Sequence, residues 1–237
     1  MPFGILKQQA DRIEKLDVAL ATMGGLVEQQ LTDALAAFEH RDAELARGVN
    51  MRDMETDRQE RQIEHLVAEL FQERRRTPAE IRRMMSAVRI ASEMERIGDL
   101  AKNVARRSII IAESDDDGEH SKHAGVGRMG KMALRQFSEA LDALFRRNAD
   151  AARAVRNADD QVDDIYNSVF RELLTLMTRM PELASTGTHL IFVAKNFERI
   201  GDHATNIAER VHFALTGEEL PHERIKTDVT TSLVAAE

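Results

Sequence analysis

Two segments of this chain carry nearly the same sequence. Residues 95–107 read Glu-Arg-Ile-Gly-Asp-Leu-Ala-Lys-Asn-Val-Ala-Arg-Arg, and residues 198–210 read Glu-Arg-Ile-Gly-Asp-His-Ala-Thr-Asn-Ile-Ala-Glu-Arg. Nine of these 13 positions are identical, at an offset of 103 residues. A chain that contains its own copy builds its fold from one repeated structural unit, so the repeat limits the architecture more than any other feature.

The repeat extends well upstream of this motif, where the offset is 106 residues. Several small, apolar and amide residues recur there, with Met23-Gly24, Gln30, Ala34-Leu35 and Ala37 matching Met129-Gly130, Gln136, Ala140-Leu141 and Ala143. Two aspartates recur in the same way, with Asp53 and Asp57 matching Asp159 and Asp163. The change from 106 to 103 means that the second copy is three residues shorter between its second and third segments.

Each copy is predicted to form three long helices. Apolar residues recur at helical spacing over about 5–39, 42–75 and 77–111, and again over about 123–147, 149–179 and 183–215. Thr77, Pro78 and Glu80 predict a capping box at one helix start, and Gly217 suits the end of the last helix. The predicted fold class is therefore all-α, with two tandem three-helix bundles. The acidic segment 113–119 separates the copies, which gives a first repeat over 1–117, a second over 118–216 and a polar tail over 217–237.

Composition excludes several classes of protein. Apolar residues make up 43% of the chain but aromatic residues only 4%, so the core must be aliphatic. The absence of cysteine excludes disulfides and thiolate metal sites. A net charge of −8 argues against a general nucleic-acid-binding protein. No apolar run reaches the roughly 18 residues of a membrane span, and the first residues lack an apolar leader, so we expect a cytoplasmic protein without membrane insertion.

Acidic residues stand four apart on the predicted helices. The third helix of each copy carries a row at i, i+4 and i+8, made by Glu95, Asp99 and Asn103 and by Glu198, Asp202 and Asn206. The second helix carries the pairs Asp53 and Asp57, and Asp159 and Asp163. Like charges at this spacing repel, at a few tenths of a kcal/mol per pair. A cation bound between two bundle helices would compensate, because carboxylates are hard oxygen ligands, so the sequence predicts a metal site in each copy.

Two glycines stand beside these acids, inside the predicted third helices. Glycine in a helix interior costs about 1 kcal/mol relative to alanine, so Gly98 and Gly201 predict a close approach by another helix or room for an ion. The same helices carry a seam of inward positions, which we expect to be Ala87, Ala91, Met94, Gly98, Ala101 and Val104, and Leu190, Ala194, Phe197, Gly201, Ala204 and Ile207.

Three other interpretations of the acidic rows stay open at this point. Such residues often lie on solvated faces, with arginines such as Arg96 and Arg199 as partners. A di-iron carboxylate enzyme would need a Glu-x-x-His pair on each of two helices, and the predicted bundle helices offer only Glu209-x-x-His212. A metal-free structural or dimerising helical adaptor is the third alternative. The chain has no phosphate-binding loop, nucleophile elbow or thiol, so we expect no enzyme.

The repeated motif also carries a resemblance to a known family. Glu-Arg-Ile-Gly-Asp-x-x-x-Asn, with the Asp-x-x-x-Asp pairs upstream, resembles the signature of the PhoU family. Residues 22–31, Thr-Met-Gly-Gly-Leu-Val-Glu-Gln-Gln-Leu, resemble that family's N-terminal segment. The likeness covers about 5–216, and it implies the PhoU-like six-helix fold, in which a pseudo-twofold axis relates the two bundles.

The resemblance also implies metal ions, with iron, zinc, manganese and magnesium as the candidates. The implied ligands are Glu95, Asp99, Glu198 and Asp202, with Asp53, Asp57, Asp159 and Asp163 on facing helices. Glu60 and Glu64 correspond to Tyr166 and Phe170, so the two sites are expected to differ in nuclearity or affinity. His203 has no histidine counterpart, because Leu100 occupies the matching position.

In function, the resemblance implies a metal-binding regulator of phosphate homeostasis with no covalent chemistry of its own. Such a protein would damp phosphate uptake and phosphate-starvation signalling. Its implied partners are the ATPase subunit of the phosphate ABC transporter (PstB-like) and a sensor histidine kinase (PhoR-like). We also expect a homodimer.

Overall fold

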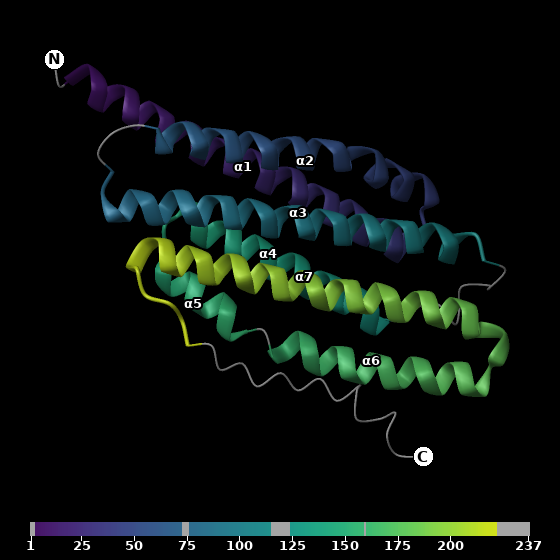
Figure 1. The fold of residues 1–237 in the computed structure, drawn as a ribbon. Helices are drawn as coiled ribbons and strands as arrows, with labels where there is room; N and C mark the ends of the chain where they lie inside the picture. Colours follow the sequence, from purple (N-terminus) through teal and green to yellow (C-terminus); the bar gives the residue numbers. More distant parts are fainter. Residues whose placement is uncertain (1–2, 73–75, 115–123, 159, 222–237) are drawn as a thin grey trace.

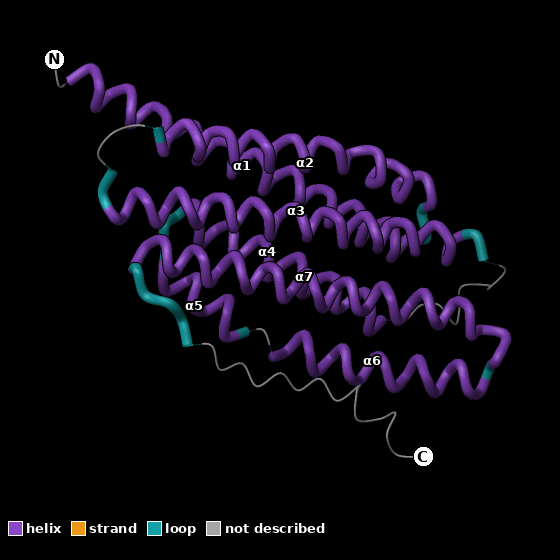
Figure 2. Tube along the Cα trace, viewed as in Figure 1, coloured by secondary structure: helices purple, strands orange, loops and turns teal. Residues whose placement is uncertain are grey.

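A computed structural model describes residues 3–72, 76–114, 124–158 and 160–221 of the chain. The side chains of residues 3–12, 52, 53, 124, 160, 161 and 163 lie outside this description as well. Within the described ranges every regular element is a helix (Figure 2). The predicted all-α class is confirmed.

The helices lie along one long axis and form two bundles (Figure 1). The first bundle consists of α1 (Phe3–His40), α2 (Ala43–Phe71) and α3 (Pro78–Ala112). The second consists of α4 (Ala124–Phe145), α5 (Ala149–Asn157), α6 (Asp160–Arg179) and α7 (Ala184–Thr216), with the 3-10 turn η1 (Pro181–Leu183) before α7. Helix α3 packs along α7, and α1 packs against α4, so these four helices join the bundles, while α2 and the α5–α6 pair cover the outer sides.

The second helix of the second copy is broken, and the prediction of one helix over 149–179 is wrong. Helix α5 ends at Asn157, and the Ala158 N–H bonds back to the Val155 carbonyl at 3.2 Å. Asparagine and aspartate surround this point in the sequence, and both favour helix ends over helix interiors because their side chains compete for backbone hydrogen bonds. The corresponding α2 of the first copy runs without interruption from Ala43 to Phe71.

The predicted seam of the third helix is confirmed at every position. All twelve residues named for it are buried, and most of them are fully inaccessible to solvent. The core around them is aliphatic, apart from a few rings such as Phe137 and Phe197. The capping box of Thr77 and Glu80 is present, and Gly217 ends α7 in the left-handed region at φ 80°.

The contact between the bundles repeats itself under the pseudo-twofold axis. A Cβ added to Gly24 in α1 would meet Leu141 Cδ2 in α4 at 3.0 Å, and a Cβ added to Gly130 in α4 would meet Leu35 Cδ1 in α1 at 2.5 Å. These two contacts are copies of each other at the offset of 106 residues. The recurring Met-Gly pairs therefore mark the crossing of the two first helices, where glycine lets the other copy's leucine approach the backbone.

Among the described residues, no helix combines the length and the apolar character that crossing a bilayer requires.

This crossing can be tested with two glycines of opposite surroundings. Gly130→Ala would place its Cβ 2.5 Å from Leu35 Cδ1 and 2.8 Å from the buried Phe197 ring. Overpacking costs about 1–3 kcal/mol, which exceeds the roughly 1 kcal/mol gain in helix propensity, so the variant should unfold at lower denaturant. Gly25→Ala meets nothing within 4 Å and should stabilise by about 0.5–1 kcal/mol. Equal stabilisation of both variants in urea unfolding would contradict the described crossing.

Candidate functional site

The first repeat holds a cluster of interacting carboxylates between α2 and α3. Burial raises the pKa of Glu95 to about 7, and the charges of Asp99, Glu60 and Asp57 add to this rise against the opposing charge of Arg96. Burial also raises the pKa of Glu60, supported by Glu64 and Asp57 and opposed by a hydrogen bond from Ser92 and by the charge of Arg61. Carboxylates from two neighbouring helices therefore face one another closely enough to oppose each other's ionisation.

The second repeat has a different arrangement at the equivalent place. Glu198 is buried, with 8% of its side chain exposed, and the Lys195 ammonium donates to its Oε1 over 2.9 Å. The same ammonium lies 4.9 Å from the centre of the Tyr166 ring, which in turn packs against Phe170. A lysine thus balances the charge of the carboxylate in this bundle.

The remaining candidate residues are placed as follows. Asn103 is exposed, and Lys102 Nζ lies 3.6 Å from Asp99 Oδ1. Asn206 donates to Glu93 Oε2 of the first repeat over 3.2 Å. Asp202 is partly buried on α7. The side chains of Asp53 and Asp163, and the whole of Asp159, lie outside the described residues.

His203 joins Asn206 in a polar contact between the repeats. Its Nδ1 lies 2.6 Å from Glu93 Oε2, so two groups of α7 hold one carboxylate of α3. Burial alone would raise the pKa of Glu93, but the hydrogen bonds from His203 and Asn206 outweigh it and lower that pKa. The second-repeat motif therefore supplies a contact across the bundles that no within-repeat spacing could predict.

The two motif glycines make room for buried glutamines. A Cβ on Gly98 would lie 3.2 Å from Gln30 Oε1, and a Cβ on Gly201 would lie 3.0 Å from Gln136 Oε1. Gln30 donates to the Gly98 carbonyl at 3.4 Å, and Gln136 donates to Thr205 Oγ1 at 2.8 Å. Of the two uses predicted for these glycines, the structure shows close approach, by a side chain of the first helix. These two amides could have been predicted from the sequence, because Gln30 and Gln136 are polar residues that recur on an apolar helix face at the offset of 106 residues.

The donor set of the first repeat suits a hard cation. Asp57, Glu60, Glu95 and Asp99 supply only oxygen atoms, and a divalent ion would offset the burial and the mutual repulsion that together raise the pKa of Glu60 and Glu95. Within the described part of the chain, no three acidic or histidine side chains are arranged to hold one ion. The equivalent place in the second repeat suits a metal poorly, because Lys195 and two aromatic rings stand where the first repeat has a serine and two glutamates.

The Glu209-x-x-His212 pair of the di-iron interpretation is held by arginines of α5. Arg156 Nε lies 3.7 Å from Glu209 Oε1, and Arg153 Nη2 lies 3.2 Å from Nε2 of the buried His212. Two guanidinium groups therefore lie where a metal ion would have to approach.

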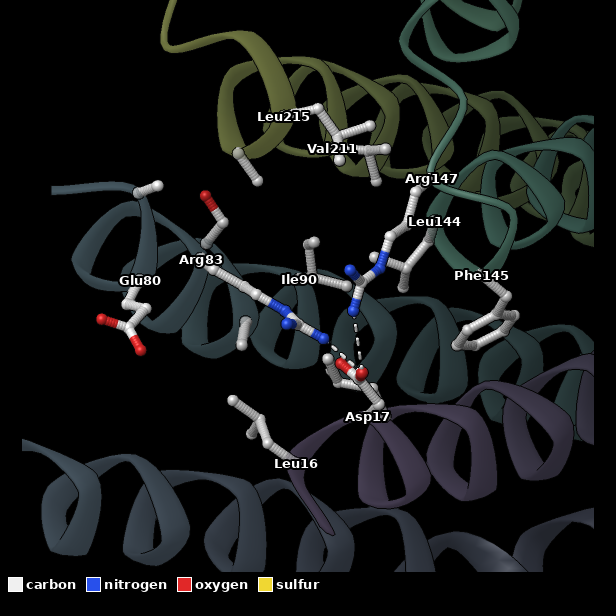
Figure 3. A pocket seen from close by; sticks show the side chains of 15 residues that line it. Leu16, Asp17, Glu80, Arg83, Ile90, Leu144, Phe145, Arg147, Val211 and Leu215 are labelled. Carbon is white, nitrogen blue, oxygen red and sulfur yellow. Dashed lines mark hydrogen bonds and ion pairs between the residues drawn. The ribbon is translucent and has the colours of Figure 1, made fainter. Parts of the chain in front are cut away.

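A cleft of about 310 Å³ opens between the bundles, beside residues 16–20 of α1, the start of α3 and the ends of α4 and α7 (Figure 3). Its wall is mainly apolar, and one carboxylate, Asp17, is shared by Arg83 of the first repeat and Arg147 of the second. The Arg147 Nη2 to Asp17 Oδ2 distance is 3.4 Å. This shared pairing links the two repeats at this end of the molecule.

Fold and site together define a duplicated three-helix-bundle protein with an oxygen-rich face in its first repeat. The PhoU domain model matches residues 20–108 and again 126–211, one match for each repeat. The chain belongs to the PhoU family, and the resemblance drawn from its motifs is confirmed.

Individual relatives agree with this assignment. A protein of Caulobacter vibrioides, named phosphate-specific transport system accessory protein PhoU homolog, is 40% identical over 94% of this chain and 96% of its own length. A protein of the same name from Rhizobium meliloti is 39% identical over 94% of this chain and 93% of its own. The crystal structure of PhoU from Pseudomonas aeruginosa superposes with a TM-score of 0.84 at 34% identity, and covers 88% of this chain and 99% of that one.

The carboxylate cluster predicts an unusual pH dependence for the metal-free protein. The pKa of Glu95 is about 7 in the folded state, against 4.5 for an ordinary glutamate. As pH rises from 4.5 to 7, the unfolded chain releases this proton while the folded chain keeps it, so folding becomes less favourable and remains so above pH 7. Glu95→Gln removes this loss. The variant should therefore gain more in melting temperature over the wild type at pH 8 than at pH 5.

The matched control is Glu69→Gln, which removes an exposed carboxylate from α2. Its melting temperature should follow that of the wild type at both pH values. A Glu95→Gln variant that shows the same difference from the wild type at pH 5 and pH 8 would contradict the raised pKa of Glu95, and with it the burial of this carboxylate beside the other acids.

Proposed function

We propose that this protein regulates phosphate uptake and phosphate-starvation signalling, and that a cation bound at the α2–α3 carboxylates takes part in this role. The observation that carries the proposal is the match of both repeats to the PhoU family, with relatives named as accessory proteins of the phosphate-specific transport system. The carboxylate cluster supports the cation, because four acids of two helices repel one another in its absence.

In this proposal the protein acts by contact and performs no covalent chemistry. It binds the ATPase subunit of the phosphate transporter and a sensor histidine kinase, and it represses uptake and signalling when phosphate is abundant. Two bundles joined along α3 and α7 give one body with separate outer faces, on α2 and on α5–α6, which suits a protein with two partners. The expected homodimer and the cytoplasmic location remain part of this proposal.

Cation binding can be measured through stability. An ion that binds only the folded chain stabilises it by about 2.7 kcal/mol at 100 times its Kd. The purified protein should therefore melt at a lower temperature after chelation and recover on addition of Mn²⁺. Asp99→Asn should reduce this recovery, whereas Asp150→Asn, at the start of α5 in the other repeat, should leave it unchanged. A melting temperature that does not respond to chelator or Mn²⁺ would contradict the cation.

The regulatory role can be tested in the cell of origin. Deletion of the gene should switch on a phosphate-starvation reporter in phosphate-rich medium, and expression of the wild-type chain should switch it off again. The Gly25→Ala variant should complement as well as the wild type, because that position faces open space. A reporter that stays silent in the deletion strain at high phosphate would overturn the regulatory proposal.

A further inference from the structure

The two repeats differ at three positions that belong to one cluster. The first repeat has Glu60, Glu64 and Ser92, and the second has Tyr166, Phe170 and Lys195. The equivalence holds in space as well as in sequence. Gly98 faces Gln30 and Thr56, and Gly201 faces their counterparts Gln136 and Val162 at the same offsets.

These substitutions form one exchange of contacts. In the first repeat, Ser92 donates a hydrogen bond to Glu60 across α3 and α2. In the second, the residues at the same two positions also meet, and Lys195 Nζ lies 4.9 Å from the ring centre of Tyr166. A hydroxyl–carboxylate contact has become an ammonium–aromatic contact, so a group with one negative charge has been replaced by a group with one positive charge.

The Lys195 ammonium lies where a bound cation would lie, and it contacts the carboxylate that such a cation would bind. It lies 2.9 Å from Glu198 Oε1, and Glu198 is the second-repeat copy of Glu95. A buried carboxylate needs a compensating charge, and here the chain itself supplies it. A metal ion at this place would have to displace Lys195, and it would meet a neutral phenol and a phenyl ring where the first repeat offers two carboxylates.

We propose that this chain binds its cation in the first repeat alone, and that the ammonium of Lys195 takes the place of that cation in the second. The inference rests on the cation binding of the proposed function and adds which repeat performs it. The consequence is a protein whose two similar halves respond differently to metal supply. In the first repeat an exchangeable cation stabilises the contact of α2 with α3. In the second repeat the side-chain ammonium of Lys195, which cannot dissociate from the chain, stabilises the contact of α6 with α7.

The test exchanges the cluster between the repeats and counts bound Mn²⁺ on the metal-free full-length chain. Lys195→Ser with Tyr166→Glu and Phe170→Glu gives the second repeat the three residues of the first, and it should about double the number of bound ions. Ser92→Lys with Glu60→Tyr does the reverse, and it should abolish binding. Arg199→Ser is the matched control, because it removes a positive charge from an exposed position of the same helix α7 and should leave the count unchanged.

Single substitutions keep the test decisive if an exchanged variant does not fold. Glu95→Gln should weaken Mn²⁺ binding at least tenfold, and Glu198→Gln should leave both affinity and stoichiometry as in the wild type. Loss of half the bound ions in Glu198→Gln would overturn this inference while the proposed cation binding stands. A wild-type chain that binds no Mn²⁺ would instead overturn the cation in the proposed function, and this inference with it.

Discussion

The packing of α3 against α7 is the contact on which the rest of the molecule depends. Each of these helices carries a full seam of buried residues and belongs to its own bundle, yet each also lies against the equivalent helix of the other copy. A helix with apolar contacts on two sides cannot be satisfied by a single three-helix unit. Polar contacts lie in the same interface, because Glu93 of α3 forms hydrogen bonds with His203 and Asn206 of α7. The acidic residues of the first repeat lie on a different side of α3, the side that packs against α2.

Much of this architecture could be predicted from the sequence, since it depends on local patterns. Helical spacing placed the seam, the Thr77 capping box placed the start of α3, and the offset of 106 residues paired the glycines that let α1 and α4 cross. The break at Ala158 could not be predicted, because a helix end without proline or glycine depends on the balance of several weak preferences. The contact of Glu93 with His203 was also beyond the sequence, because it joins residues 110 positions apart on helices whose relative register only the packed fold determines.

The sequence predicted the two helices that carry the interacting carboxylates of the first repeat, but not the arrangement of charges around them. Spacing by four placed Asp57 and Asp99 on facing helices, and the fold brings both near Glu95 and Glu60. The difference in charge between the repeats could not be predicted from the sequence, because Ser92 and Lys195 lie outside the repeated motif. Their role is visible only in the folded chain, where Ser92 contacts Glu60 and Lys195 contacts Tyr166. After a duplication, one copy can keep the geometry while its charges change, as long as the buried amides and glycines that set the helix spacing remain. Gln30 and Gln136 have remained here.

The exchange of leucines between α1 and α4 has a consequence for how the protein is made. Leu35 packs against the backbone at Gly130, which is synthesised 95 residues (130 − 35) after it. At about 5–20 residues per second, a ribosome needs several seconds to synthesise the chain from Leu35 to Gly130. During this time the apolar side of α1 that later packs against α4 remains exposed. The nascent chain is therefore most prone to aggregation midway through translation, when a chaperone that shields this flank would have its greatest effect.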